Sequence, residues 1–231
     1  MHRSVLAPLS FLVLAAMAAV TAPAAAQTAS LVEDIHPGKS DTGAYPDEMW
    51  SFRGKVLFTA REPSSGTELW ITDGTGAGTR LLADLFPGED SSYPDILGEM
   101  GSLVFGVAGG DCCSTSRSFL WRSDGTREGT FLLDPGMDVA IPYYDRSDDF
   151  GEGPIVPVAL MKDAVYFTGC EGQDDCGLWR TDGTVAGTKL LKTIGKPLGG
   201  YPRNLTAAGD RLFFVAGQQL WTSDGTPEGT T

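Results

Sequence analysis

Histidine is scarce in this chain, and this scarcity limits the chemistry that the chain can perform. Only His2 and His36 occur among the 231 residues. A histidine-rich metal site is therefore excluded, and a Ser-His-Asp triad would depend on a single histidine outside the apolar segments. The sequence also lacks a phosphate-binding glycine loop and a metalloprotease helix motif. We therefore predict no catalytic residue and no bound cofactor, and expect a protein that is not an enzyme.

Basic residues are the minority among the charged residues. The chain has 17 Lys and Arg against 30 Asp and Glu, which gives a formal net charge of −13 and a pI of about 4.4. A surface of this charge repels nucleic acid and anionic lipid headgroups. Nucleic acid is therefore excluded as a partner, whereas cationic partners and divalent ions remain compatible with the charge.

Long apolar runs are also missing, except for one near the start. Residues 5–20 follow the basic start M-H-R and are too short and alanine-rich for a comfortable membrane span. With Ala24, Ala25 and Ala26 behind them, they are typical of a signal peptide over residues 1–26 that is cleaved before Gln27. We expect a secreted, periplasmic or cell-surface protein of residues 27–231, with no membrane span after cleavage.

Cysteine occurs only four times. In an oxidising compartment such cysteines are candidates for disulfides. Cys170 and Cys176 flank a short polar loop, so a bridge across the mouth of a hairpin is sterically reasonable. Cys112 and Cys113 are adjacent and either form a vicinal disulfide or each pair with one of the other two. Three pairings remain open.

What the chain has in abundance is internal repetition, which determines the fold class before any local pattern does. E-L-W-I-T-D-G-T-G-A-G-T-R-L-L begins at Glu68, F-L-W-R-S-D-G-T-R-E-G-T-F-L-L at Phe119, G-L-W-R-T-D-G-T-V-A-G-T-K-L-L at Gly177 and Q-L-W-T-S-D-G-T-P-E-G-T-T at Gln219. The repeated tryptophans are Trp70, Trp121, Trp179 and Trp221, spaced 51, 58 and 42 residues apart.

Each copy is predicted to form four short strands over residues 45–88, 93–137, 154–195 and 201–231. The second strands, V-L-F, L-V-F, V-Y-F and L-F-F, are apolar on consecutive residues, so both faces of each small sheet must be covered. Stacked blades provide that cover. The prediction is an all-β protein, a β-propeller domain of four repeat units with four-stranded antiparallel blades.

The fourth copy lacks its last strand, and residues 30–38 match such a strand ahead of the first copy. Either this displaced fourth strand closes a four-bladed ring, or the chain is a fragment of a larger propeller. The stop in mid-hairpin favours the fragment.

Turn chemistry explains the repeated D-G-T without a ligand. Each Asp carboxylate is expected to accept the backbone N–H two residues on, and each Gly to supply a positive φ. The tryptophans are expected to fill the gaps between neighbouring blades. The turn residues are Asp73, Asp124, Asp182 and Asp224, followed by Gly74, Gly125, Gly183 and Gly225.

The pattern L-W-x-[ST]-D-G-T-x-x-G-T-x-L-L, followed by D-L-F-P-G and S-S-Y-P, resembles the ELWxxDGT repeat of exported bacterial proteins. The resemblance covers nearly all of residues 30–231 and implies a repeat scaffold, but it assigns no activity to any residue. The second copy departs from the pattern, with Phe119 where Glu68 stands and a shortened L-L-D-P-G.

The leading hypothesis for function is binding or surface interaction, with an unknown protein or glycan contacting a loop face. The long loops at residues 109–118 and 170–177, on one face, are the expected contact region. One alternative is a carbohydrate-active catalytic propeller with carboxylates in its channel. Another is an adhesive module stabilised by Ca²⁺ bound in acidic loops at residues 84–95, 145–152 and 171–175, although solvated turns are the favoured interpretation of those acids.

Overall fold

The computed structural model describes residues 30–37, 43–109, 117–133, 139–142, 158–171, 175–194 and 201–231. All regular elements within these ranges are β-strands. Accordingly, no helix in the described part of the chain is long and apolar enough to cross a membrane. The predicted signal peptide lies outside the described residues.

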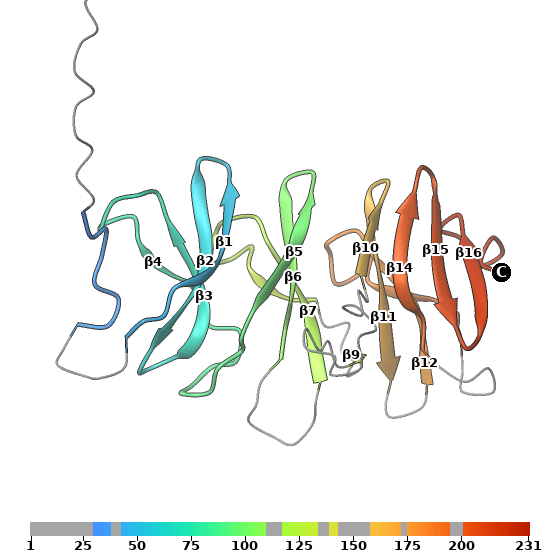
Figure 1. Cartoon of the computed structure of the whole chain (residues 1–231), viewed down its shortest axis with the longest axis horizontal. Coiled ribbons are helices and arrows are strands. Elements are labelled where there is room, and N and C mark those ends of the chain that lie inside the picture. Colours follow the sequence, from blue (N-terminus) through green and yellow to red (C-terminus); the bar gives the residue numbers. More distant parts are fainter. Residues whose placement is uncertain are drawn as a thin grey trace, which may run out of the picture. The chain divides into compact units, whose positions relative to one another are not determined.

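The first repeat copy folds into one four-stranded antiparallel sheet, here named blade 1. Its strands are β1 (Asp47–Phe52), β2 (Lys55–Glu62), β3 (Gly66–Thr72) and β4 (Arg80–Ala83), paired in chain order (Figure 1). A tight turn with a positive φ at Gly54 joins β1 to β2. The consecutive residues Leu57 and Phe58 on β2 are both buried, as the apolar pattern of the second strands predicts.

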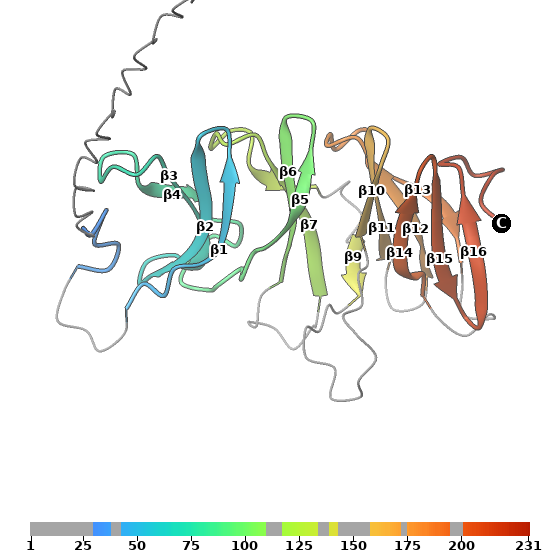
Figure 2. The ribbon, with the colours of Figure 1, turned by 45° about the horizontal axis from the view of Figure 1, so that its top comes forward.

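The other copies repeat this arrangement, with one difference in the last. Blade 2 contains β5 (Asp95–Met100), β6 (Leu103–Ala108), β7 (Arg117–Ser123) and β8 (Phe131–Leu132). Blade 3 contains β10 (Val158–Met161), β11 (Ala164–Glu171), β12 (Asp175–Thr181) and β13 (Lys189–Thr193). Blade 4 contains β14 (Arg203–Ala208), β15 (Arg211–Ala216) and β16 (Gln219–Ser223), and is drawn in red in Figure 2. The all-β, blade-type fold predicted from the repeat is thus confirmed, with four strands in three blades and three strands in blade 4.

Apolar side chains of consecutive blades share common cores. Leu57 of blade 1 lies in one buried cluster with Trp121 of blade 2. Phe105 of blade 2 lies in another with Trp179 of blade 3. Each of these blades therefore has an outgoing face, which contacts the next blade in the chain, and an incoming face, which contacts the one before.

The repeated tryptophans belong to the incoming faces. Those of blades 2 to 4 lie in the gaps between neighbouring blades, as predicted, whereas Trp70 of blade 1 packs with Phe58 and Ile35. Trp70, Trp121 and Trp179 are buried, and Trp221 is half-buried. In three copies the cross-strand neighbour of the tryptophan is a phenylalanine, for example Phe167 beside Trp179 with ring centroids 6.2 Å apart. Cross-strand aromatic pairs of this kind add stability to a sheet.

Blade 2 replaces that phenylalanine with Gly106, and the tryptophan moves into the space. A Cβ built on Gly106 would lie 2.2 Å from the ring of Trp121, so no larger residue fits. The indole N–H of Trp121 also donates a hydrogen bond to the carbonyl oxygen of Val107 at 3.1 Å. Gly106 is therefore required by the close approach of the indole ring and of the Asp95 carbonyl oxygen, and not by its backbone conformation.

Residues 30–38, predicted as a displaced fourth strand, behave differently in the structure. Residues 30–37 form no strand. Instead the side chain of Ile35 packs against the cluster of Phe58 and Trp70 on the incoming face of blade 1. The half-buried Ile35 thus packs this segment against the first sheet, without backbone pairing to any strand of the described residues.

Candidate functional site

The four D-G-T turns form the same hydrogen-bond network in every copy. In blade 3, the backbone N–H and the hydroxyl of Thr184 both donate to Oδ1 of Asp182, at 2.9 and 2.7 Å. The hydroxyl of Thr181 accepts from the N–H of Gly183 and shares a 2.7 Å hydrogen bond with the hydroxyl of Thr188. The predicted Asx-turn is therefore confirmed.

The glycine after each aspartate has a positive φ, between 85° and 95°, as predicted. A second glycine in each turn is required for another reason. A Cβ built on Gly187 would lie 2.1 Å from Oδ1 of Asp182, and Gly78, Gly129 and Gly229 meet their own aspartates in the same way. The repeated D-G-T-x-x-G is thus explained by turn geometry alone.

Hydrogen bonds from threonine also stabilise the charged form of the four aspartates. The side-chain hydroxyl of the following threonine is the largest cause that lowers the pKa of Asp73, Asp124, Asp182 and Asp224 below the usual range. The end of each blade that carries these turns is named the turn end. Because Oδ1 of each carboxylate accepts the backbone and hydroxyl donors of its own turn, the aspartates of the turn end have a structural role.

A buried carboxylate fixes the linker between blades 1 and 2. Glu68 on β3 has no exposed surface. Its two oxygens accept hydrogen bonds from the N–H of Leu85 at 2.9 Å, the N–H of Ser92 at 2.7 Å and the hydroxyl of Ser92 at 2.6 Å. Burial raises the pKa of Glu68 to about 7, against the lowering effect of these hydrogen bonds. Sequence reasoning missed this role, although Glu68 differs from its counterparts in the other copies.

The residues equivalent to Glu68 make other contacts. Phe119 packs edge to face against Phe86, at 6.1 Å between ring centroids. Gly177 lies so close to the backbone of Lys192 that an added Cβ would be 2.4 Å from its carbonyl oxygen. The residue at the repeat position of Glu68 therefore determines how each blade contacts the neighbouring segments. These contacts are polar in one copy and apolar or backbone contacts in others.

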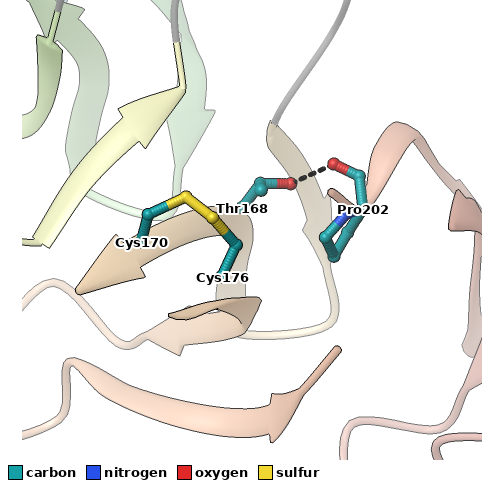
Figure 3. Close-up of a disulfide and its surroundings, with 4 residues drawn as sticks. All are labelled: Thr168, Cys170, Cys176 and Pro202. Carbon is teal, nitrogen blue, oxygen red and sulfur yellow. Dashed lines mark hydrogen bonds between the residues drawn. A yellow bond between two sulfur atoms is a disulfide. The ribbon is translucent and has the colours of Figure 1, made fainter. Parts of the chain in front are cut away.

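The disulfide predicted across the mouth of a hairpin is present. Cys170 on β11 and Cys176 on β12 are cross-strand partners joined by a disulfide (Figure 3). On the same strand, the hydroxyl of Thr168 donates a 2.6 Å hydrogen bond to the carbonyl oxygen of Pro202, at the entry to blade 4. Cys112 and Cys113 lie outside the described residues.

One strand that the sequence did not predict connects blades 2 and 3. β9 (Val139–Pro142) pairs antiparallel with the start of β7, Ser118 opposite Ile141, and with the end of β11, Cys170 opposite Ala140. β7 follows the loop of residues 109–118, and β11 precedes the loop of residues 170–177. Backbone pairing through β9 therefore gathers the bases of the two predicted contact loops.

We name this region the loop end of blades 2 and 3. It consists of the start of β7, β9, the end of β11 and the Cys170–Cys176 disulfide. In an antiparallel hairpin the loop between the second and third strands lies at the opposite end from the other two turns. The loop end and the turn end are therefore at opposite ends of these blades.

The acidic loops proposed as calcium ligands are only partly described. Residues 84–95 lie between blades 1 and 2, where Asp84 accepts a 3.4 Å hydrogen bond from the N–H of Gly88. Within the described ranges no three His, Cys, Asp or Glu side chains gather as a metal site. Residues 145–152 and 172–174 lie outside those ranges.

The fold defines the chain as an all-β protein built from propeller-type blades. No protein-family model matches the chain, and no curated protein matches it. Among solved structures it is similar to TolB from Acinetobacter baumannii, at 14% identity and a TM-score of 0.37, covering 75% of this chain and 39% of TolB. It is also similar to the computationally designed Ika4 protein, at 13% identity and a TM-score of 0.38, covering 84% of this chain and 98% of that one.

A third similarity is to the catalytic domain of the GH62 alpha-L-arabinofuranosidase of Coprinopsis cinerea. The identity is 10% and the TM-score 0.32, covering 86% of this chain and 71% of that chain. The chain thus spans less than half the length of TolB, and its identity to each of these structures is below 15%.

Proposed function

We propose that this chain is an exported, non-enzymatic repeat protein of the ELWxxDGT type that binds a protein or glycan through the loop end of blades 2 and 3. The observation that carries the proposal is the pairing of β9 with both β7 and β11. Binding loops held on paired strands are a recurrent arrangement, because the strands fix the base of each loop while its tip varies.

Two features favour the loop end over the turn end as the binding surface. The disulfide between Cys170 and Cys176 restricts one of the loops covalently, which lowers the entropy lost when a partner binds. At the turn end, by contrast, each aspartate uses Oδ1 to hold its own turn, as Asp182 does for Thr184, so its carboxylate already has a structural role.

The negative charge of the chain favours a basic partner. A net charge of −13 attracts basic surfaces and accelerates their association. A protein with a basic patch is therefore the preferred partner, and a neutral or cationic glycan is the second. Export through a signal peptide would present the loop end to either class.

The test compares two variants with the same change in charge. The loop variant carries Glu171→Gln and Asp175→Asn, and the control carries Glu128→Gln and Glu228→Gln at the turn end. Both are titrated by surface plasmon resonance against immobilised lysozyme, as a basic protein, and applied to an array of bacterial polysaccharides. We expect at least a tenfold weaker interaction for the loop variant and less than a twofold change for the control.

Three outcomes would contradict the proposal. Equal losses in both variants would mean that only the overall charge attracts the probe, and wild-type protein that binds no probe would remove the binding function. Turnover of any polysaccharide on the array would contradict the non-enzymatic part and favour the catalytic alternative.

A further inference from the structure

A tyrosine is exposed at the entry to three of the four blades. Tyr45, Tyr93 and Tyr201 each precede the proline that leads into the first strand of a blade, and they are 64%, 51% and 44% exposed. We name them the entry tyrosines. The remaining tyrosine of the described ranges, Tyr166, is buried, so exposure belongs to this repeat position and not to tyrosine in general. The entry to blade 3 lies outside the described residues.

The entry tyrosines lie at the end of the blade that is opposite the turn end. In each blade the first strand runs towards the turn that joins it to the second strand, so its start lies beside the loop between the second and third strands. In blade 1 the carbonyl oxygen of Ala44, next to Tyr45, accepts a 2.7 Å hydrogen bond from the N–H of Arg61, close to that loop. We name this end of every blade the entry end, and the loop end of blades 2 and 3 is part of it.

Tyr93 is fixed beside the base of the first contact loop, residues 109–118. Its own N–H donates to the carbonyl oxygen of Thr67 at 3.3 Å, and the carbonyl oxygen of the buried Ser92 accepts from the N–H of Gly109 at 2.8 Å. The φ of Tyr93 is 42°, in the left-handed region that a bulky residue adopts only where its surroundings impose it. The backbone of Tyr93 is therefore held in place while the residue stays exposed, which lowers the entropy lost on binding.

Tyr201 is tied to the base of the second contact loop, residues 170–177. The carbonyl oxygen of the adjacent Pro202 accepts a 2.6 Å hydrogen bond from the hydroxyl of Thr168, which lies two residues before Cys170 on β11 (Figure 3). Each of the two contact loops therefore has an exposed tyrosine linked to its base by a hydrogen bond of the neighbouring residue.

Acidic segments accompany both of these tyrosines. Glu89 and Asp90 are exposed in the linker that leads to Tyr93. Near Tyr201, the loop between β11 and β12 contributes E-G-Q-D-D over residues 171–175. No Lys or Arg occurs between Arg80 and Arg117, whereas six acids do: Asp84, Glu89, Asp90, Asp95, Glu99 and Asp111.

The exposed basic residues gather at the opposite end of the blades. Among the residues whose burial is described, Arg61 and Arg203 are the exposed ones at the entry end. The turn end has the others, which are Arg53, Lys55, Arg80, Arg127, Lys162, Lys189 and Arg211. The turn end thus carries both signs of charge, and a cationic partner is attracted more strongly to the entry end.

We infer that the entry tyrosines and the acids beside them bind an extended, arginine-rich segment of a partner protein. Arginine suits both features, because its planar guanidinium stacks on aromatic rings and forms paired hydrogen bonds with carboxylates. The ammonium group of lysine is a compact point charge that does neither as well. The segment must be extended, since the tyrosines lie on different blades. This inference rests on the proposed function and specifies its partner.

The test compares two fluorescein-labelled peptides of equal charge, octa-arginine and octa-lysine, titrated with the purified chain by fluorescence anisotropy. We expect octa-arginine to bind more tightly. Tyr93→Leu and Tyr201→Leu should each weaken its binding by about 2- to 5-fold, and the double variant by about 5- to 25-fold, whereas both Phe variants should bind as wild type does. Equal binding of the two peptides, or a double leucine variant that binds octa-arginine as wild type does, would overturn the inference.

A control variant and a competitor separate this contact from other causes. Val185→Ala is the control, because Val185 is 44% exposed at the turn end, and it should change nothing. Far-UV circular dichroism checks that every variant is folded. Dextran serves as a neutral glycan, and its displacement of octa-arginine from wild type would show that the tyrosines hold a sugar and would overturn the inference.

The loop variant with Glu171→Gln and Asp175→Asn distinguishes failure of this inference from failure of the proposed function. Loss of lysozyme binding in the loop variant, with octa-arginine binding unchanged in the double leucine variant, would overturn the inference and leave the loop end as the binding surface. Octa-arginine binding that depends on Tyr93 and Tyr201 but not on the two loop acids would support the tyrosine contact and contradict the proposed role of the loops.

Discussion

Replacement of Trp179 by alanine tests the packing between blades 2 and 3. The indole is 1% exposed and lies in a cluster with Phe105 and Leu120 of the preceding blade. It also packs against Phe167 across the strand pair. The substitution removes contacts within its own sheet and between sheets at once.

The expected loss in the free energy of unfolding is about 3 to 5 kcal/mol, the usual cost of emptying a fully buried tryptophan site. Such a loss can approach the whole stability of a domain, so Trp179→Phe is measured beside it as a milder step. Trp221→Ala provides a graded comparison, because Trp221 is only half-buried and should cost less than Trp179.

The assay is equilibrium urea unfolding followed by far-UV circular dichroism, with the slope of the transition checked for each variant. A loss below about 1 kcal/mol for Trp179→Ala would show that the indole is not enclosed and would refute the packing argument. An equal loss for Trp179→Ala and Trp221→Ala would contradict the graded burial.

Three further predictions concern single contacts. Burial raises the pKa of Glu68 from its ordinary value of 4.5 to about 7 in the folded protein, so its contribution favours folding below about pH 4.5 and is lost as the pH rises towards 7. Between pH 5 and pH 7.5, urea unfolding should show that the free energy of unfolding of wild type falls relative to that of Glu68→Gln, by up to about 3 kcal/mol. An equal change with pH in both proteins would refute the raised pKa of Glu68. Reducing the Cys170–Cys176 bridge, or substituting both cysteines by serine, should cost about 2 kcal/mol in the same assay, because the closed loop is short; no change would mean that the hairpin is equally restricted without it. Gly106→Ala should lower the melting temperature by several degrees, because a Cβ there overlaps the Trp121 ring and the Asp95 carbonyl oxygen, whereas Gly54→Ala should act only through its positive φ. A harmless Gly106→Ala would contradict this close packing around Gly106.

Local patterns predicted much of this fold because the deciding interactions are local. The D-G-T turns depend on contacts within seven residues, as between Thr181 and Thr188, so their chemistry could be inferred from the repeat itself. The consecutive burial of Leu57 and Phe58 likewise follows from an apolar strand that must be covered on both sides.

The features that sequence reasoning missed depend on distant parts of the chain. Glu68 reaches Ser92, 24 residues away, and no local pattern indicates that its carboxylate holds a linker. β9 pairs with two strands of different blades, which requires knowledge of how those blades are placed. The need for glycine at position 106 is understood only beside the Trp121 ring on the neighbouring strand.

The N-terminal segment shows why a sequence match does not fix a strand. Residues 31–35 resemble β4, but a strand also needs a partner edge, and residues 30–37 have none in the structure. Ile35 packs on blade 1 even though the segment has no strand partner. The sequence match of residues 31–35 to β4 therefore predicts where this segment packs, but not its hydrogen bonding.

The central claim is that consecutive sheets stack through the repeated apolar positions, and a double-mutant cycle tests it most directly. Phe105→Leu and Trp179→Phe, in neighbouring blades, are measured singly and together by urea unfolding. The account predicts a coupling energy of at least about 0.5 kcal/mol for this pair and additivity within that amount for Phe105→Leu with Trp221→Phe, in blades that are not consecutive. Strict additivity of Phe105→Leu and Trp179→Phe would contradict the stacking of blades 2 and 3.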